Sequence, residues 1–407
     1  MTNDFRLVNK LPFISIMISA TEAKQIIADN FLTKRIARVP LLQANQCVLA
    51  QTIVAPIHTP PFNQSAMDGY AFAFKDLQHS KTFSVTQKIA AGDISKIKLL
   101  AGEAARVYTG SPIPEGADTV VMQEKVESQN STIEILDDKI SVGLNVRLQG
   151  SQTKKGEMVL SSGILLMPPA ISYIASMGIA EVEIYDKPKV SVIITGKELL
   201  QPGQSIDGGK IYESNSFGLI AALNQLNIEP LSVQIITDDE VQITNAVKQA
   251  LQSDIIILTG GVSVGDYDFV ADALTGAGVE KIFHKVKQKP GKPFYFGRKN
   301  DTLVFGLPGN PASVMTCFYQ YVVDAISNFT QRDYFAKFIL PLGNTYEKKT
   351  SLTHFMKGNK NENAVTVLKN QESYLMNSFA MANCIIEFDA EKEIFIAGDL
   401  VSIRMIL

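Results

Sequence analysis

The turn that closes the segment from Asp254 to Asp268 holds the residues of this chain best suited to chemistry. An apolar run ends there in the sequence D-I-I-I-L-T-G-G-V-S-V-G-D-Y-D. Gly260 and Gly261 let the backbone approach a ligand, Ser263 offers a hydroxyl, and the amides that follow suit a phosphate. Asp266 and Asp268 suit a cation held on that phosphate. Taken alone, such a turn is more often an ordinary connection between a strand and a helix.

Three other motifs carry groups for anions and cations. T-G-K-E-L places Glu198 beyond a strand end, where it would face a crevice, although an exposed glutamate near a helix start fits equally well. K-P-G-K-P lets Lys289 and Lys292 converge on one anion because prolines restrict its backbone, whereas solvated surface lysines are the plainer interpretation. G-L-P-G-N-P-A-S opens a helix, so its amides and Ser313 would face an anion.

Two clusters earlier in the chain are weaker signals. P-P-F-N-Q-S-A-M-D-G-Y places Asp68 on a turn, which D-G alone would also explain. Y-T-G-S-P-I-P-E-G-A-D sets Thr109 and Ser111 around a glycine, as a cradle for an oxyanion or as a rigid proline turn. Together the motifs indicate phosphate chemistry with metal help, in which Glu198 and Asp268 bind a divalent cation and the lysines bind a second anion.

Composition excludes several other classes of function. The 407 residues have a net charge of -3, which gives no reason to expect nucleic acid or an acidic membrane as partner. Three scattered cysteines and four histidines without motif spacing argue against disulfides, zinc and triad chemistry. The common dinucleotide and P-loop motifs are missing. No apolar stretch is long enough to span a membrane and no signal peptide is recognised, so the cytoplasm is the expected location.

Hydrophobic patterns predict the elements that must position these motifs. A helix is expected from Ser19 to Asn45 with Thr21 as its cap, and another after Pro168 that stops at Gly178. From residue 190 the strand candidates V-S-V-I-I-T, L-S-V-Q-I-I-T, D-I-I-I-L-T and T-L-V-F-G-L alternate with helix candidates, which predicts a doubly wound α/β domain. The helix candidates cover Ser216 to Leu226, Glu240 to Gln252 and Pro311 to Phe329.

The fold class is therefore predicted as multidomain α/β with four parts. Residues 1–46 and 149–187 form a discontinuous helical connecting domain, and 47–148 form a β-rich inserted domain broken by Pro and Gly. Residues 188–331 form the α/β domain, and 332–407 form a C-terminal β domain of barrel-like or sandwich type. The α/β loops should all emerge at one edge of one sheet.

Six of these motifs together resemble the molybdopterin molybdenumtransferase family of the MoeA type, which is similar to the C-terminal enzyme domain of gephyrin. They are S-A-M-D-G-Y, T-G-S-P-I-P-E-G-A-D, T-G-K-E-L, G-G-V-S-V-G-D-Y-D, K-P-G-K-P and G-L-P-G-N-P. The resemblance implies a homodimer in which the molybdopterin-binding-like α/β domain of one subunit faces the β-rich insertion of the other. It also implies that adenylylated molybdopterin and molybdate react with magnesium to give molybdenum cofactor and AMP, and that an adenylylating enzyme of the same pathway is a partner.

The resemblance also implies roles for individual residues. Those implied to bind adenylylated molybdopterin are Gly260, Gly261, Ser263 and Gly265, with Thr109 and Ser111 from the facing module. Those implied as catalytic carboxylates are Asp68, Glu198 and Asp268, of which Glu198 and Asp268 bind magnesium with Asp238 as a weaker member. Those implied to bind molybdate are Lys289, Lys292, Ser313 and Ser373.

The chain departs from the family pattern at several positions. Where relatives show R-x-x-G-E-D, it reads R-L-Q-G-S-Q, so Ser151 and Gln152 replace two acids. T-E-F-x-R-G has become T-H-F-M-K-G, which leaves Lys357 as the nearest basic residue, a point charge without the arginine fork. T-G-D-E-L has become T-G-K-E-L at Lys197. Two alternative functions stay open: a non-catalytic molybdopterin-binding scaffold, which the missing acids favour, and a nucleotide-pyrophosphate hydrolase of the CinA type.

Overall fold

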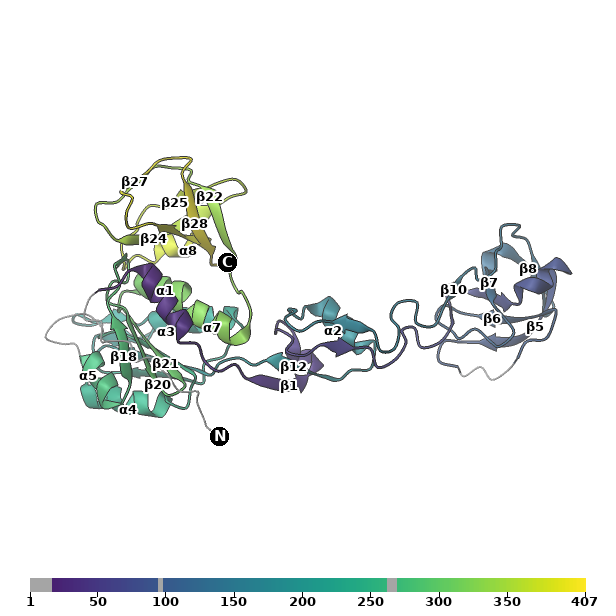
Figure 1. Cartoon of the computed structure of the whole chain (residues 1–407), viewed down its shortest axis with the longest axis horizontal. Helices are drawn as coiled ribbons and strands as arrows, with labels where there is room; N and C mark the ends of the chain where they lie inside the picture. The colour runs from purple at the N-terminus through teal and green to yellow at the C-terminus, as the bar shows by residue number, and fades with distance from the viewer. Residues whose placement is uncertain (1–16, 94–97, 262–268) are drawn as a thin grey trace, which may run out of the picture. The chain divides into compact units, whose positions relative to one another are not determined.

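The computed structural model describes residues 17–93, 98–261 and 269–407. Two compact units make up the chain (Figure 1). The first unit contains the N-terminal part up to Ala37, Gln46–Val48 and Tyr185–Leu407. The second contains Arg38–Asn45 and Leu49–Ile184. Within the described ranges, no helix is long and apolar enough to cross a membrane.

A six-stranded sheet lies at the centre of the first unit, in the order β16-β13-β17-β21-β20-β18. The four strands predicted from sequence are parallel neighbours: β13 (Val190–Thr195), β16 (Ser232–Ile236), β17 (Ile255–Thr259) and β21 (Thr302–Leu307). The sequence did not predict two further strands, β18 (Glu280–His284) and β20 (Tyr295–Lys299). Strand β20 runs antiparallel to both β18 and β21. The predicted doubly wound domain is confirmed, with an antiparallel extension at one side.

Helices cover both faces of this sheet (Figure 1). On one face Ile193, Ile256 and Leu258 pack against α4 (Glu240–Ala250) and α5 (Phe269–Gly276). The opposite face packs against α1 (Ala20–Asp29), α3 (Asn215–Gln225), α6 (Pro311–Cys317) and α7 (Val323–Thr330). A π-helical segment, Phe318–Val322, joins α6 to α7. Because both faces are covered, every residue of β13, β17 and β21 is buried, which explains their apolar runs.

The first helix is much shorter than the predicted span from Ser19 to Asn45. Ser19, not Thr21, is its cap: the Ser19 hydroxyl accepts from the Glu22 amide at 3.1 Å, and Glu22 accepts from the Ser19 amide at 2.7 Å. Asn30 ends the helix, because its side chain and backbone N–H both donate to the Ile26 carbonyl. The chain then continues into β1 (Ile36–Pro40) and a short 3-10 turn (Leu41–Ala44).

The C-terminal residues form a second sheet, as predicted, in the order β19-β24-β26-β28-β22 with β25 beside β24. The strands are β19 (Gln288–Lys289), β22 (Lys337–Pro341), β24 (Thr353–Lys360), β25 (Val365–Val367), β26 (Cys384–Phe388) and β28 (Leu400–Met405). Smaller elements are β14 (Leu199–Leu200), β15 (Ile211–Tyr212), β23 (Tyr346–Glu347), β27 (Ile394–Phe395) and α8 (Asn377–Ala380). Arg404 of β28 binds both carboxylate oxygens of Asp324 on α7, at 2.7 and 2.8 Å, which attaches this sheet to the α/β domain.

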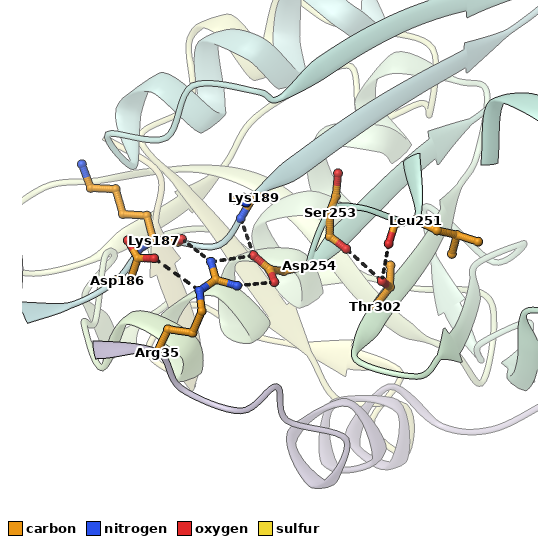
Figure 2. Close-up of polar contacts among 8 residues, drawn as sticks. All are labelled: Arg35, Asp186, Lys187, Lys189, Leu251, Ser253, Asp254 and Thr302. Carbon is orange, nitrogen blue, oxygen red and sulfur yellow. Dashed lines mark hydrogen bonds and ion pairs between the residues drawn. The ribbon is translucent and has the colours of Figure 1, made fainter. Parts of the chain in front are cut away.

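Arg35 ties the segment after α1 to the edge of the sheet where the strands begin (Figure 2). Its guanidinium donates to both oxygens of Asp254, at 2.5 and 2.9 Å, and to Asp186 at 3.3 Å and the Lys187 carbonyl at 3.2 Å. Asp254 also accepts from the Lys189 amide at 2.6 Å. Asp254 is thereby a structural residue, on the side of the sheet away from the glycine turn.

We expect Arg35→Ala to lower the free energy of unfolding by about 2–3 kcal/mol, because it leaves a mostly buried carboxylate without its charged partner. Urea unfolding followed by circular dichroism measures this loss. Lys392→Ala, which removes a more exposed ion pair with Asp399 in the same unit, is the control and should cost about 0–1 kcal/mol. Equal losses in the two variants would contradict a special role for Arg35.

The second unit, which joins Arg38–Asn45 to Leu49–Ile184, is β-rich. Its main sheet has the order β7-β4-β6-β5-β9-β8. The strands are β4 (Gly69–Phe72), β5 (Thr82–Ile89), β6 (Glu103–Val107), β7 (Thr119–Met122), β8 (Val126–Gln129) and β9 (Thr132–Ile135). Short elements complete the unit and its boundary: β2 (Ile53–Val54), β3 (Gln64–Ser65), β10 (Val146–Arg147), β11 (Met158–Leu160), α2 (Pro168–Ala175), β12 (Glu181–Tyr185) and the 3-10 turns Phe74–Gln78 and Gln123–Lys125. The predicted helix after Pro168 is confirmed, although the segments around it are largely strand and loop.

Candidate active site

The predicted loops do emerge at one edge of the central sheet. Glu198 follows β13, Asp238 follows β16, and Gly260 and Gly261 follow β17 directly. These strands are parallel neighbours, so their carboxyl ends lie side by side. The turn Pro308–Asn310 follows β21, the next parallel strand. Four sequence segments far apart in the chain therefore meet at this edge.

A pocket of about 560 Å³ opens at the same edge. Glu198, Asp238, Gly260 and Gly261 all line it, so the structure brings together these predicted site residues. The other lining residues come from the loops around them: Thr195, Leu199, Ile211, Tyr212, Glu213, Ser214, Asn215, Pro293, Pro308, Gly309, Asn310, Pro311 and Tyr374. Tyr374 belongs to the C-terminal part of the chain, which thus contributes to the pocket.

The two glycines of the turn leave no room for side chains. Gly260 has φ +90°, and a Cβ there would lie 2.3 Å from the Thr195 carbonyl oxygen and 2.7 Å from its hydroxyl. Gly261 has φ +60°, and a Cβ there would lie 2.7 Å from Val270 Cγ2. A side chain at either position would push neighbouring groups aside and occupy a backbone conformation that favours glycine. The turn therefore needs Gly260 to pack against Thr195 and Gly261 to pack against Val270.

Several buried oxygens around this turn have no hydrogen-bond partner in the part of the chain that the structure describes. They are Thr195 Oγ1, Thr259 Oγ1, Asn215 Oδ1 and Asp238 Oδ1. Buried polar atoms are normally paired, so such a group of unpaired oxygens around one pocket favours a polar ligand. Sequence reasoning missed Thr195 and Asn215. The signal for Thr195 was present in T-G-K-E-L, whereas Asn215 stands in no motif.

The carboxylates at this edge suit a hard cation, since oxygen ligands are those that Mg²⁺ prefers. Glu198 and Asp238 both line the pocket, and one oxygen of Asp238 is buried and unpaired. Residues 17–93, 98–261 and 269–407 contain no group of three or more His, Cys, Asp or Glu side chains that could hold a metal ion. The predicted site residues Ser263, Gly265 and Asp268 lie outside the described residues.

The K-P-G-K-P loop joins the two sheets of the first unit. Lys289 ends β19, which pairs with β24 of the C-terminal sheet, and Pro293 lines the pocket. Gln288 holds the turn through its side-chain amide, which donates to the Pro290 carbonyl at 3.2 Å and the Gly291 carbonyl at 3.0 Å. Lys289 and Lys292 are exposed, and neither is among the residues that line the pocket.

The other two predicted anion residues lie around the start of α6. Ser313 is buried in its first turn. Ser373 reaches the same helix start from the C-terminal part, because its hydroxyl accepts from the Asn310 side chain at 2.9 Å and its carbonyl accepts from the Ala312 amide at 3.1 Å. Both serines are therefore near the turn that ends β21.

Lys357, the basic residue of T-H-F-M-K-G, is part of the C-terminal sheet and not of the pocket lining. Its side chain is buried, and its ammonium donates to the carbonyls of Asn370 at 2.9 Å, Glu372 at 3.3 Å and Leu375 at 3.1 Å. Burial lowers the pKa of Lys357, and the charge of Glu372 opposes that shift. All three protons of the ammonium have a partner, so Lys357 anchors a loop and does not stand ready for an anion.

In the second unit, Asp68 and Thr109 form one cluster. The exposed Asp68 carboxylate accepts from the Thr109 amide at 2.8 Å and from its hydroxyl at 2.9 Å, and these bonds lower the pKa of Asp68. Ser111 is fully buried, and its hydroxyl accepts from the Tyr108 amide at 3.2 Å. Thr109 thus holds Asp68 in its ionised form, while Ser111 supports the turn from inside.

Arg106 stands beside this cluster and was missed by the sequence analysis, although it lies two residues before the quoted Y-T-G-S-P-I-P-E-G-A-D segment. Its guanidinium lies 5.0 Å from the ring centroids of both Tyr70 and Tyr108. It donates to the Gly69 carbonyl at 3.0 Å and to the side chain of Gln123. These contacts fix a positive charge near Asp68, which further lowers the pKa of that carboxylate.

Comparisons with known proteins cover nearly the whole chain. Residues 18–178 match the MoeA N-terminal region (domain I and II), and residues 191–328 match the probable molybdopterin binding domain. The molybdopterin molybdenumtransferase of Haemophilus influenzae is 35% identical, covering 89% of this chain and 92% of that protein. That of Staphylococcus aureus strain Mu50 is 32% identical, covering 95% of both chains. The crystal structure of the molybdopterin biosynthesis protein MoeA of Pyrococcus horikoshii superposes with a TM-score of 0.75 at 30% identity, covering 96% of this chain and 100% of that one.

Proposed function

Because this chain belongs to the molybdopterin molybdenumtransferase family, we propose that the pocket beyond β13, β16, β17 and β21 is where it inserts molybdenum during cofactor biosynthesis. The observation that carries this placement is the convergence of Glu198, Asp238 and the Gly260–Gly261 turn on one pocket with unpaired buried oxygens. The activity is that of a transferase. The identity of the adenylylated substrate, the need for magnesium and the dimeric site are our proposals.

The glycine turn takes the phosphate of adenylylated molybdopterin. Its backbone amides approach a ligand closely because neither glycine has a side chain, and the Thr195 hydroxyl beside them can donate to a phosphate oxygen. The predicted contributions of Ser263 and Gly265 to this phosphate site stay part of the proposal. In the reaction, water hydrolyses the phosphoanhydride bond so that AMP leaves, and molybdate gives up oxygen as water when its molybdenum is inserted into molybdopterin.

Glu198 and Asp238, with Asp268 as predicted, would hold magnesium. Bound there, magnesium supplies positive charge that neutralises the phosphate groups during cleavage. Asp238 suits this role because its buried oxygen is unpaired, and Glu198 because it lines the same pocket. Asp68 acts as the further catalytic carboxylate, kept ionised by Thr109 and Arg106.

Molybdate binds at the lysine loop and the two serines near α6. It is a tetrahedral dianion, so two ammonium groups and hydroxyls match its charge and its oxygens. Gly291 permits the turn, since a Cβ there would lie 2.5 Å from Cys317 Sγ. Lys289, Lys292 and Ser373 come from loops that meet near the pocket.

We expect Lys292→Met to raise the KM for molybdate about 10-fold or more, because it removes a charge-assisted hydrogen bond. Initial rates of AMP release at varied molybdate measure the change. Lys248→Met makes the same substitution at an exposed site in the last turn of α4, which leads to the opposite edge of the sheet, and its KM should equal that of the unmodified protein. A normal KM in Lys292→Met would remove Lys292 from the molybdate site.

The central test of the function is an insertion assay with the purified full chain. Given adenylylated molybdopterin, magnesium and molybdate, the protein should release AMP and form cofactor that reconstitutes a molybdenum apoenzyme. Binding of the nucleotide without AMP release at any molybdate concentration would favour a scaffold, for which Ser151 and Gln152 in place of two acids are the specific observation. Release of AMP without cofactor formation would favour a pyrophosphate hydrolase.

A homodimer with a site shared between subunits would bring Asp68 of one chain to Glu198 of the other. We expect the single variants Asp68→Asn and Glu198→Gln to be inactive as pure dimers. Co-expressed in equal amounts, they should regain about a quarter of the normal activity, since half of the dimers are mixed and each mixed dimer has one intact site. If each subunit used its own Asp68 together with its own Glu198, the mixed dimers would also be inactive, and co-expression would restore no activity. The cytoplasmic location and the adenylylating partner remain predictions.

A further inference from the structure

The loop from Asn370 to Leu375 places an exposed aromatic side chain at the pocket. Tyr374 lines the pocket but is 63% exposed. A second tyrosine in the lining, Tyr212, is 45% exposed, and its hydroxyl donates to the Gln204 carbonyl at 2.7 Å. Large aromatic side chains usually bury most of their surface, so rings left open at a pocket suit a ligand with a flat apolar face.

Lys357 fixes one side of this loop. The residue is 4% exposed, and its ammonium donates to three carbonyls of the loop. Gln371 strengthens the attachment, because its side chain accepts from the Lys357 amide at 2.9 Å and donates to the Lys357 carbonyl at 2.8 Å. A buried ammonium needs such partners, so its placement and that of the loop depend on each other.

Ser373 fixes the other side of the loop. It is joined to the start of α6 by the bonds to Asn310 and Ala312 described above. Asn310 lies in the pocket wall, so the loop is attached to the wall itself. Tyr374 thus directly follows Ser373, which two hydrogen bonds hold to the start of α6. The backbone at Tyr374 is therefore held in place without a ligand.

We propose that Tyr374 is the wall on which the planar heterocycle of the substrate packs, and that Lys357 is the positioning residue that holds this wall at the pocket. The inference rests on the proposed function and extends it to the C-terminal part of the chain. Flat nitrogen heterocycles stack well on tyrosine. The substrate offers two of them, the purine of its AMP half and the pterin of its molybdopterin half.

Tyr374→Trp provides a direct reporter, because the chain contains no tryptophan. Titration of this variant with AMP alone, and separately with molybdopterin alone, should change its tryptophan emission in a saturable way with one of the two. A response to AMP assigns the purine to Tyr374, and a response to molybdopterin alone assigns the pterin. Phe31→Trp, at a 59% exposed site that does not line the pocket, is the control and should respond to neither.

Lys357→Met in the Tyr374→Trp background tests the positioning role. The ligand concentration at half-saturation should rise about 10-fold, the scale of one lost stacking contact. Lys357→Arg, which can donate to the same carbonyls, should recover most of the affinity. With the native Tyr374 and at saturating molybdate, Lys357→Met should raise the KM for adenylylated molybdopterin more than it lowers kcat, since Glu198 and Asp238 do not belong to the loop that Lys357 holds.

Circular dichroism shows whether Lys357→Met is folded, and if it is not, Tyr374→Ala replaces it and should show the same rise in KM. An unchanged half-saturation in a folded Lys357→Met protein overturns the positioning role. No emission change with either ligand, in a Tyr374→Trp protein that still releases AMP, overturns the aromatic wall and leaves the insertase function standing. Failure of the unmodified protein to release AMP counts instead against the proposed function.

Discussion

Asp238→Asn is expected to lower kcat for AMP release by about 100-fold or more and to raise the magnesium concentration needed for half-maximal activity. Asn keeps the shape of Asp but cannot bind a cation by charge. The Asp238 oxygen that is buried and unpaired lies 3.8 Å from the position of a Cβ at Gly261, so the carboxylate stands beside the proposed phosphate turn. Magnesium would neutralise the negative charge that develops during cleavage, so loss of one of its ligands should raise the activation free energy by several kcal/mol.

The neighbouring Asp239 provides a matched control for this prediction. Its side chain caps α4 by accepting from the Gln242 amide at 2.9 Å. Asn is as good a helix cap as Asp, so Asp239→Asn should keep both its stability and its turnover. Rates of AMP release at saturating molybdate, measured over a range of magnesium concentrations, compare the two variants. Equal turnover in both would place the metal away from Asp238.

A second large effect is expected from pH, through His354 on β24. This histidine is buried, its Nδ1 is 2.7 Å from the Tyr346 hydroxyl, and its Nε2 is 2.8 Å from the Thr350 hydroxyl. Burial, followed by the charges of Lys289 and Lys348, lowers the pKa of His354 from 6.5 to about 4. The folded protein therefore keeps the ring neutral at a pH where the unfolded chain already binds a proton.

The unfolded state binds more protons than the native state between pH 6.5 and about 4, so stability falls as pH falls through this window. The full difference corresponds to about 3 kcal/mol in the free energy of unfolding. Urea unfolding at several pH values measures it, and His354→Gln, which keeps a polar side chain that does not titrate, should lose this part of the pH dependence. The same decline in both proteins would show that carboxylates, not His354, cause the loss.

Much of the α/β domain was predictable because its signals are local. The runs in β13, β17 and β21 contain no polar alternation, which is typical of strands buried on both faces. Once these strands were recognised as parallel, Glu198 and Gly260 had to emerge at the same edge. The short strands β18 and β20 were missed because E-K-I-F-H and Y-F-G-R-K carry charges and lack a clear period.

Local sequence signals also gave predictions that tertiary or capping contacts overrode. The apolar period from Ser19 onward continued past Asn30, but the cap formed by Asn30 stops α1, and the residues after it pair in strands. Ser111 stands in a motif that fits either an oxyanion cradle or a rigid turn, and its side chain is fully buried, where its hydroxyl accepts from the Tyr108 amide. In both cases, contacts across the turn decided the outcome over residue type.

By itself, the sequence determined the family, the four parallel strands and the residues Glu198, Asp238 and Gly260 that follow three of them. Backbone direction alone brings such loops together, so no knowledge of packing was needed. Only the tertiary structure showed where Lys357 and Tyr374 lie and which groups surround them. Their roles depend on which carbonyls lie around a buried ammonium and which ring stays open at a pocket, and both follow from contacts between residues distant in sequence.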